Sequence, residues 1–178
     1  MVDKDLDSFL ISHKNDYQRL HIAIENKLKE LKDKYNVWFQ SRLKSKQSII
    51  EKYSKDQTFS YKELKDVIGF RIVYPWTKGL HDLANILTDI KELKIFSKKT
   101  IENDKVIYLF GQTSINTIYE IQFWPTIMYT CFEFEHDKVY KPKKELTEKQ
   151  IEQTFMLRKN EHSLQDYIDK NILVPYDF

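Results

Sequence analysis

Four short runs of β-branched and aromatic residues, set among stretches of helical periodicity, limit most strongly what this chain can fold into. Such runs are typical of β-strands; they lie at 69–74, 94–101, 106–112 and 117–124. The last two are joined by the short segment TSIN, which predicts a hairpin. Helices are expected before, between and after these strands. The order predicts an α+β (α/β two-layer) domain with a small mixed sheet of about four strands flanked by helices.

Apolar residues spaced three or four positions apart predict the helices. A long amphipathic helix is expected over 16–35, and Thr77 is placed to cap the helix that follows the first strand. Ser60 and Glu63 have the spacing of a capping box, which predicts a short helix over 61–66. The remaining helices are predicted at 46–54, 126–138, 147–160 and 163–170.

Composition favours one folded domain over residues 1–178. Hydrophobic residues make up 41% of the chain, and only three Gly and four Pro leave little room for a flexible linker. The single cysteine, Cys131, cannot form an internal disulfide, which favours a reducing compartment. There is neither a signal peptide nor an apolar run of the ~18 residues that a membrane span needs. We therefore expect a soluble cytoplasmic protein with no membrane partner.

Positive charge is concentrated in one segment although the net charge is only +2. Residues 27–55 hold nine Lys and Arg against three Asp and Glu. Within them, SRLKSKQSIIEKYSK (41–55) has five basic residues and one acid. Two interpretations remain open: an ordinary solvated helix face, or a row of cations that binds phosphates.

Two carboxylates mark a candidate metal site. Asp66 lies just ahead of the first predicted strand, and Glu120 lies inside the last one. Glu120 shares a strand face with Gln122 and Trp124, and a charged residue is unwelcome in a core. If the two strands are neighbours, Asp66 and Glu120 can hold one Mg²⁺, which prefers hard oxygen ligands and keeps water or phosphate in its shell. Alternatively, Glu120 is an exposed residue of an edge strand and Asp66 a helix-end acid.

Four motifs carry a family resemblance. RLKSKQSIIEK, DVIGFRIVY, YEIQFW and EHDKVYK occur in this order between about residues 40 and 141. Together they resemble the signature motifs of the RelA/SpoT-type synthetase domain, which makes (p)ppGpp. The resemblance implies the nucleotidyltransferase-like fold of that domain, and the short chain is similar to the small, stand-alone synthetases.

The resemblance also implies a reaction and residue roles. The family moves the β,γ-pyrophosphate of ATP to the 3′-hydroxyl of a guanosine nucleotide with the help of Mg²⁺. Asp66 is implied as a metal ligand, and Glu120 as a second ligand or as the group that orients and deprotonates the attacking hydroxyl. Gln122, His136 and Lys141 are implied as supporting residues, although His136 is equally well a surface helix residue. The implied ATP-binding residues are Arg42, Lys44, Ser48, Lys52 and Arg71.

The acceptor half of the family pattern is altered. The Tyr-x-Ser-x-His motif, whose Tyr stacks on guanine, is absent from 98–122, and the segment is short, with END at 102–104. Tyr108 is the nearest aromatic candidate, although strand periodicity explains it as well. Trp124 and Pro125 stand where the family usually has Arg after Glu-Ile-Gln.

Three functional hypotheses therefore remain. The chain is an alarmone synthetase that recognises GDP or GTP through other residues, or a toxin-like relative that pyrophosphorylates the 3′ end of tRNA. Thirdly, it is a catalytically degenerate module that binds nucleotides or proteins. The basic segment suits an RNA backbone. A homo-oligomer or an antitoxin partner is compatible with all three hypotheses, and the helix at 147–160 is a candidate for self-association.

Overall fold

The centre of the molecule is a five-stranded mixed sheet. The computed structural model describes residues 2–55, 64–135 and 147–172. The strands are β1 (Trp38–Leu43), β2 (Ile68–Tyr74), β3 (Ile95–Ile101), β4 (Val106–Gln112) and β5 (Ile118–Pro125). They lie in the order β1-β2-β5-β4-β3, and only β2 and β5 are parallel. The predicted α+β class and mixed sheet are confirmed.

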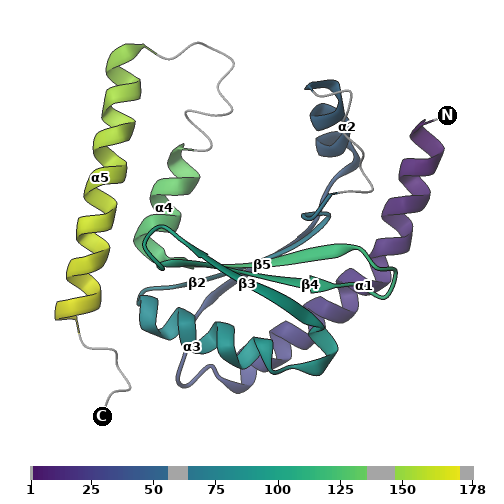
Figure 1. The fold of residues 1–178 in the computed structure, drawn as a ribbon, viewed down its shortest axis with the longest axis horizontal. Coiled ribbons are helices and arrows are strands. Elements are labelled where there is room, and N and C mark those ends of the chain that lie inside the picture. Colours follow the sequence, from purple (N-terminus) through teal and green to yellow (C-terminus); the bar gives the residue numbers. More distant parts are fainter. Residues whose placement is uncertain (1, 56–63, 136–146, 173–178) are drawn as a thin grey trace.

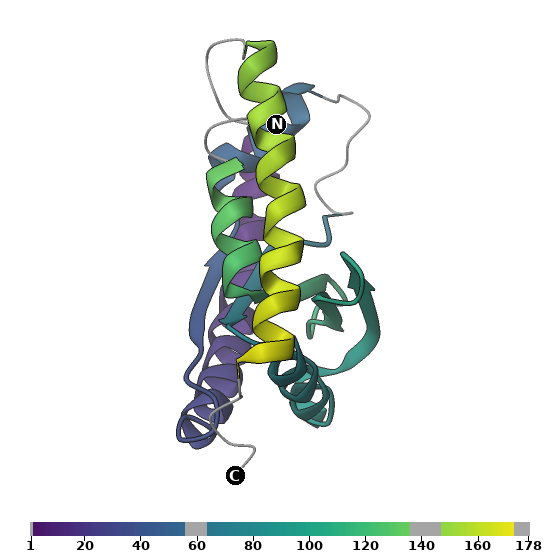
Figure 2. The same cartoon turned by 90° about the vertical axis from the view of Figure 1, so that its left-hand side faces the viewer.

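Helices are divided between the two faces of the sheet. They are α1 (Val2–Glu30), α2 (Lys46–Lys55), α3 (Thr77–Thr88), the 3₁₀ turn η2 (Lys91–Leu93), α4 (Thr126–Glu135) and α5 (Glu148–Asn171). Helices α1 and α3 cover one face, while α2 rises beyond the other face at one side and α4 and α5 rise at the opposite side (Figure 1). Helix α5 runs alongside α4 (Figure 2).

Strand alternation separates the core from the second face. Phe70 and Ile72 of β2 and Ile121 and Phe123 of β5 are at most 1% exposed and pack in one cluster with residues of α1 and α3. Because successive side chains of a strand point to opposite faces, the residues between them face away from this core. We call the side opposite α1 and α3 the open face; it carries Glu120.

Strand β1 is the element that the sequence did not reveal. It is an edge strand in which exposed and partly exposed residues alternate, and it pairs antiparallel with β2. Residues 38–43 lack the β-branched run of the other strands and lie in the basic segment. Arg42 therefore belongs to a strand, whereas α2 begins only at Lys46.

Several predicted helix bounds were wrong. Helix α1 spans Val2–Glu30 instead of 16–35, and the helices predicted at 147–160 and 163–170 are the single helix α5. Residues 64–66 are not helical, and the rest of the helix predicted at 61–66 lies outside the described residues. Helix α4 is described as far as Glu135, so the last three residues of the predicted 126–138 helix lie outside too.

The start of α3 is satisfied by a neighbouring helix. Thr77 is the first residue of α3 and not its N-cap, which is Trp76. The Thr77 backbone N–H and hydroxyl donate to the carboxylate of Asp169 in α5, at 2.9 and 2.7 Å. Asp169 therefore places a negative charge at the N-terminus of α3, where negative charge is favoured. The two hydrogen bonds hold α5 against α3.

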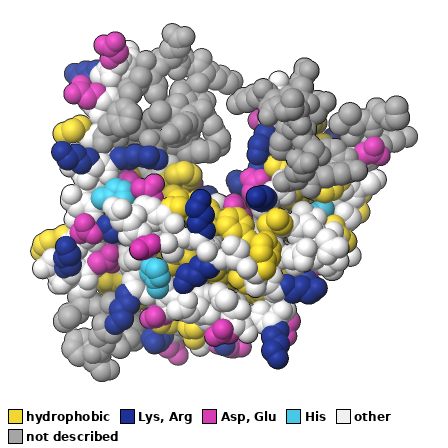
Figure 3. Space-filling model, viewed as in Figure 1, with side chains coloured by type: hydrophobic (Ala, Val, Ile, Leu, Met, Phe, Trp, Pro, Cys, Tyr) yellow, Lys and Arg dark blue, Asp and Glu magenta, His cyan; other side chains and the backbone are white. Residues whose placement is uncertain are grey.

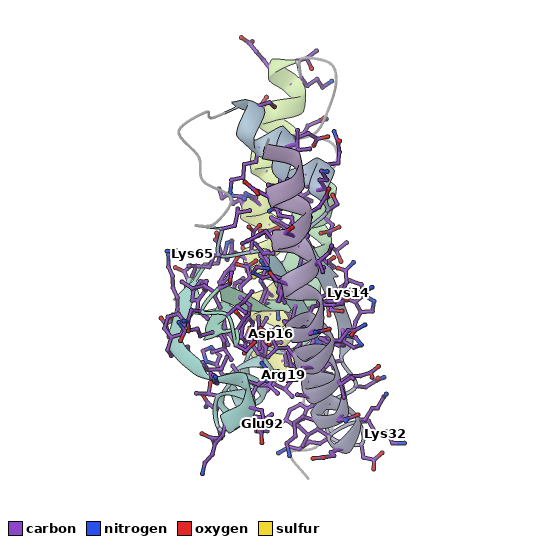
Figure 4. All side chains as sticks on the ribbon, turned by 90° about the vertical axis from the view of Figure 1, so that its right-hand side faces the viewer. Lys14, Asp16, Arg19, Lys32, Lys65 and Glu92 are labelled. Atoms are coloured by element: carbon purple, nitrogen blue, oxygen red, sulfur yellow. The ribbon has the colours of Figure 1, made fainter. Side chains whose placement is uncertain are left out.

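The β4–β5 turn is fixed to α1. Asp16 is 4% exposed and accepts hydrogen bonds from the Ser114 backbone N–H at 2.9 Å and hydroxyl at 2.7 Å. Arg19 donates to Asp16 at 3.0 Å and to the Glu92 backbone carbonyl at 3.1 Å, on the side of α1 opposite Lys14 and Lys32 (Figure 4). Burial acts to raise the pKa of Asp16, but these hydrogen bonds outweigh it and hold the pKa below 3.8.

Removal of this contact should destabilise the fold. Asp16→Ala leaves the Ser114 N–H without its partner, and we expect the free energy of unfolding to fall by about 1–3 kcal/mol. Denaturant unfolding at pH 7 measures the change. Asp5→Ala, at an exposed position of the same helix, is the control and should stay within about 0.5 kcal/mol of the parent. Equal losses in the two variants would show that the contact with the turn contributes nothing.

Candidate active site

One row of cross-strand neighbours places cations beside Glu120. On the open face, Arg42 of β1 is paired with Gly69 of β2, which is paired with Glu120 of β5. A Cβ atom at Gly69 would lie 3.6 Å from Arg42 Nε, at an ordinary van der Waals distance, so the Arg42 side chain lies beside this residue.

Asp66 closes this row at the start of β2. Its carboxylate accepts a short hydrogen bond from Lys44 Nζ and lies 3.6 Å from Arg42 Nη2. The Lys44 backbone N–H donates to the Val67 carbonyl at 2.8 Å, which holds the residues after β1 next to Asp66. The ion pair is partly buried, with the Lys44 side chain 13% and the Asp66 side chain 25% exposed.

Glu120 is a carboxylate held in a partly apolar position. The Gln122 amide donates to Glu120 Oε1 at 2.6 Å. Burial is the largest influence on the Glu120 pKa and raises it above 4.5; the negative charge of Asp66 adds to the rise. The hydrogen bond from Gln122 and the charges of Arg42 and Lys44 act in the opposite direction. The charge of Asp66 therefore reaches Glu120, and joint metal binding by the two carboxylates stays a prediction.

Arg71 lies on the open face but is directed toward α4. It donates to Gln122 Oε1 at 3.0 Å, to the Tyr129 hydroxyl at 3.2 Å and to Glu133 at 2.9 Å. Its guanidinium also lies 5.0 Å from the centroid of the Tyr129 ring, which is a cation–π contact. Arg71 therefore orients the Gln122 amide, whose nitrogen faces Glu120. Among the described contacts, Arg71 is joined to Glu120 through Gln122, whereas Arg42 and Lys44 contact Asp66.

Helix α2 carries two of the predicted ATP-binding residues. Ser48 and Lys52 are exposed and one helical turn apart. Ser45 Oγ accepts from the Ser48 backbone N–H at 3.2 Å, an N-cap contact, and donates to the Ser48 hydroxyl at 2.9 Å. Lys46 is directed to α1, where it pairs with Asp7 at 2.9 Å. His136 and Lys141 lie outside the described residues.

The surface above the sheet is hollowed. Figure 3 shows a depression between α2 on one side and α4 and α5 on the other. Hydrophobic side chains are visible beside it, together with Lys, Arg, Asp and Glu side chains. Acidic and basic side chains of the described residues thus lie beside one concave surface.

The donor set fits a magnesium ion that keeps much of its own shell. In the described residues, no group of three or more His, Cys, Asp and Glu side chains is placed to hold a metal. Asp66 and Glu120 are two hard carboxylates, and Mg²⁺ is commonly bound by one or two carboxylates with water and substrate phosphates. For Asp66 to bind a cation, it has to release Lys44, its present partner.

The partners of Arg71 are the site residues that the sequence did not indicate. Tyr129 and Glu133 lie 58 and 62 positions away from it in sequence, on α4. Both fit the pattern of an ordinary helix, so only the placement of α4 at the end of β5 reveals them. Glu133 balances the charge of Arg71, whose side chain is 16% exposed.

Comparisons with known proteins identify the family to which this fold belongs. Residues 41–165 match the family described as "Region found in RelA / SpoT proteins", and the chain belongs to this family. No curated protein sequence matches the chain significantly.

Solved structures extend the likeness in fold to nearly the whole chain. Small alarmone synthetase 1 from Bacillus subtilis matches with a TM-score of 0.76 and 17% identity, over 94% of this chain and 95% of that one. The protein smu.1046c from Streptococcus mutans UA159 matches with a TM-score of 0.74 and 19% identity, over 92% and 94%. The Type VI effector Tas1 matches at 0.53 and 12%, over 88% and 94%.

No helix in the described parts of the chain combines the length and the apolar character needed to cross a membrane.

Proposed function

We propose that this chain is a pyrophosphokinase that moves the β,γ-pyrophosphate of ATP to the 3′-hydroxyl of a guanosine nucleotide. The observations that carry the proposal are the contacts of Asp66 with Lys44 and Arg42 and the cross-strand row in which Gly69 lies between Arg42 and Glu120. Small alarmone synthetase 1 from Bacillus subtilis has been crystallised with AMPCPP and with its product pppGpp. These complexes support ATP as the donor and a guanosine nucleotide as the acceptor.

The reaction breaks one phosphoanhydride bond and forms one ester bond. The 3′-oxygen of the acceptor attacks the β-phosphorus of ATP, the bond from that phosphorus to the bridging oxygen breaks, and AMP leaves. Glu120 orients the attacking hydroxyl and takes its proton, while Gln122 and Arg71 hold Glu120 in place. Asp66 and Glu120 would hold Mg²⁺, which neutralises charge on the transferred phosphates when bound.

Lys44 and Arg42 are the proposed phosphate-binding cations, and both contact the carboxylate that is the proposed metal ligand. In the free protein, Asp66 pairs with Lys44 and lies near Arg42. If Asp66 held the metal ion, Lys44 and Arg42 would be free to contact the triphosphate, where charge neutralisation lowers the barrier. Ser48 and Lys52 on α2 complete the proposed ATP contacts, and His136 and Lys141 keep their proposed supporting roles.

A second candidate acceptor is the 3′ end of tRNA. The absence of Tyr-x-Ser-x-His and the basic segment 27–55 favour it. The likeness to Tas1, which was crystallised with its immunity protein, supports a toxin-like role and a protein partner. The third candidate, a module that binds nucleotides without transfer, is supported by the same departure from the family pattern.

Transfer from [γ-³²P]ATP separates these candidates. We expect purified protein with Mg²⁺ to label GDP or GTP at the 3′ position, read by thin-layer chromatography. If only deacylated tRNA became labelled, the acceptor would be the 3′ end of tRNA and not a guanosine nucleotide. ATP binding without labelled product, at high protein concentration, would contradict both transfer reactions and leave the binding module.

A further inference from the structure

Trp124 of β5 is buried, yet its indole N–H takes part in the hydrogen bonds of the open face. The residue is 6% exposed and packs in a small apolar cluster with Val73 and Met128. A buried indole N–H needs an acceptor, and Trp124 Nε1 donates to Gln122 Oε1 at 3.3 Å. Trp124 therefore contacts the side chain that in turn contacts Glu120.

Two donors converge on the side-chain oxygen of Gln122. Besides the indole of Trp124, Arg71 Nε donates to Gln122 Oε1 at 3.0 Å. Arg and Trp side chains carry N–H donors and no acceptor, so the atom that they share has to be the amide oxygen. The amide nitrogen therefore faces Glu120 and donates to its Oε1 at 2.6 Å. A reversed amide would place N–H against N–H on one side and oxygen against a carboxylate on the other.

The two donors differ in how firmly they are held. The Arg71 side chain is 16% exposed, and its guanidinium also donates to Glu133 of α4. Because Arg is charged and binds phosphate strongly, a phosphate ligand can compete for it. Trp124 is uncharged and fixed by packing, with its ring centroid 4.8 Å from that of Phe132. The indole N–H can therefore keep the amide oriented while Arg71 contacts a ligand.

We propose that Trp124 is a positioning residue for Glu120, because its indole N–H holds the Gln122 amide with the nitrogen toward this carboxylate. The proposal rests on the proposed function, in which Glu120 takes the proton of the attacking hydroxyl. The amide occupies Glu120 Oε1, whereas Oε2 has no hydrogen-bond partner among the described residues. Trp124 thus acts through Gln122 to leave Oε2 as the oxygen that is free for the acceptor hydroxyl.

Trp124→Phe tests the indole N–H, because Phe keeps an aromatic ring and removes the donor. We expect kcat of transfer to fall about three- to tenfold, which corresponds to the loss of one neutral hydrogen bond. The KM for ATP should stay within about twofold, because the lost interaction orients Glu120 and does not bind the donor. Trp76→Phe is the matched control: it removes an indole hydrogen bond to the Ile172 carbonyl at the start of α3 and should leave kcat unchanged.

NMR of the side-chain N–H groups tests the same contact without turnover. The chain has three Trp, so the indole signal of Trp124 is the one that Trp124→Phe lacks. The amide pair of Gln122 is likewise the one that Gln122→Leu lacks. We expect Trp124→Phe to speed the exchange of the Gln122 amide protons with water about three- to tenfold. Gln122→Leu should shift the Trp124 indole signal, whereas Trp76→Phe should change neither group.

A double variant shows whether Trp124 acts through Gln122. If it does, Trp124→Phe should cost no further activity in a protein that already carries Gln122→Leu, because two changes in one chain of contacts are not additive. Thermal unfolding verifies that each variant is folded. Where Trp124→Phe fails to fold, β-(3-benzothienyl)alanine in place of Trp124 keeps the bicyclic shape and replaces only the N–H by sulfur, and the same results are expected from it.

The outcomes separate this proposal from the proposed function. Parent-like exchange of the Gln122 amide in a folded Trp124→Phe variant, or additive losses in the double variant, overturns the positioning role of Trp124. Glu120-dependent transfer in the same preparations would then leave the pyrophosphokinase proposal intact. If no acceptor is labelled but the exchange of the Gln122 amide depends on Trp124, the proposed function fails and the orientation of Gln122 by Trp124 is supported.

Discussion

Replacement of Glu120 by Gln is expected to lower the rate of pyrophosphate transfer about 10³-fold and, at the same time, to make the free protein more stable at neutral pH. Gln keeps the shape of the side chain and an oxygen for the hydrogen bond from Gln122, which donates at 2.6 Å. It removes a metal ligand and the group that takes the proton of the attacking hydroxyl. Steady-state transfer rates and thermal unfolding measure the two effects.

The gain in stability follows from the raised pKa of Glu120. Because burial favours the neutral acid, the folded-state pKa lies above the ordinary 4.5. The stability that the neutral acid confers is fully present below pH 4.5 and is lost as the pH rises through the folded-state pKa. The parent and Glu120→Gln should therefore melt at similar temperatures near pH 4 and diverge toward pH 7. Each 1 kcal/mol of divergence corresponds to a rise of roughly 2–4 °C.

The matched control is Glu92→Gln, an exposed acid on η2. It should change neither transfer nor the dependence of melting temperature on pH. If Glu120→Gln transferred pyrophosphate like the parent, Glu120 would have no part in the chemistry. If the Glu120→Gln variant melted at a lower temperature than the parent at pH 7, the destabilisation that we assign to the partly buried charge of Glu120 would be wrong.

Replacement of Asp66 by Asn is expected to reduce transfer by about 10²–10³-fold and to shift half-maximal activity to higher Mg²⁺ concentration. Asp66 is the proposed metal ligand and also the anion that faces Lys44 and Arg42. Removal of the Asp66 charge is therefore expected to strengthen the binding of ATP in the absence of metal, although it weakens transfer in the presence of Mg²⁺. Lys44 and Arg42 keep their charges but lose their carboxylate partner, so metal-free ATP should bind more tightly to the variant than to the parent.

Calorimetric titration of ATP in EDTA and in Mg²⁺ tests this reversal. Asp89→Asn, at an exposed position that ends α3, is the control and should bind ATP like the parent under both conditions. Weaker binding of ATP to Asp66→Asn in EDTA would show that the pair with Lys44 does not compete with phosphate. Unchanged Mg²⁺ dependence of transfer would remove Asp66 from the metal site.

The strand that carries Glu120 could be predicted because the alternation of its side chains is visible within a few residues of sequence. Its hydrophobic residues alternate with Glu120 and Gln122, and a charged side chain in mid-strand has to face away from the core. Asp66 was placed ahead of β2 because the run of β-branched and aromatic residues begins only after it. That β2 and β5 are parallel neighbours, with Gly69 beside Glu120, is a long-range fact that no local pattern encodes.

The elements that were missed have equally specific reasons. Strand β1 is a half-exposed edge strand whose polar residues conceal its period. The bounds of α1 were misplaced because its first half has fewer apolar residues at regular spacing, although Leu6 and His13 are buried there. The environment of Arg71 depends on α4, which only the folded chain brings to it.

The measurement that tests the central claim most directly uses ATP labelled at both the α- and the γ-phosphate. With Mg²⁺ and the acceptor, the account predicts one AMP released for each γ-label that appears on the 3′-hydroxyl, and loss of both in Glu120→Gln and Asp66→Asn. Release of ADP instead of AMP, or transfer that survives in both variants, would contradict a pyrophosphate-transferring centre built on these two carboxylates.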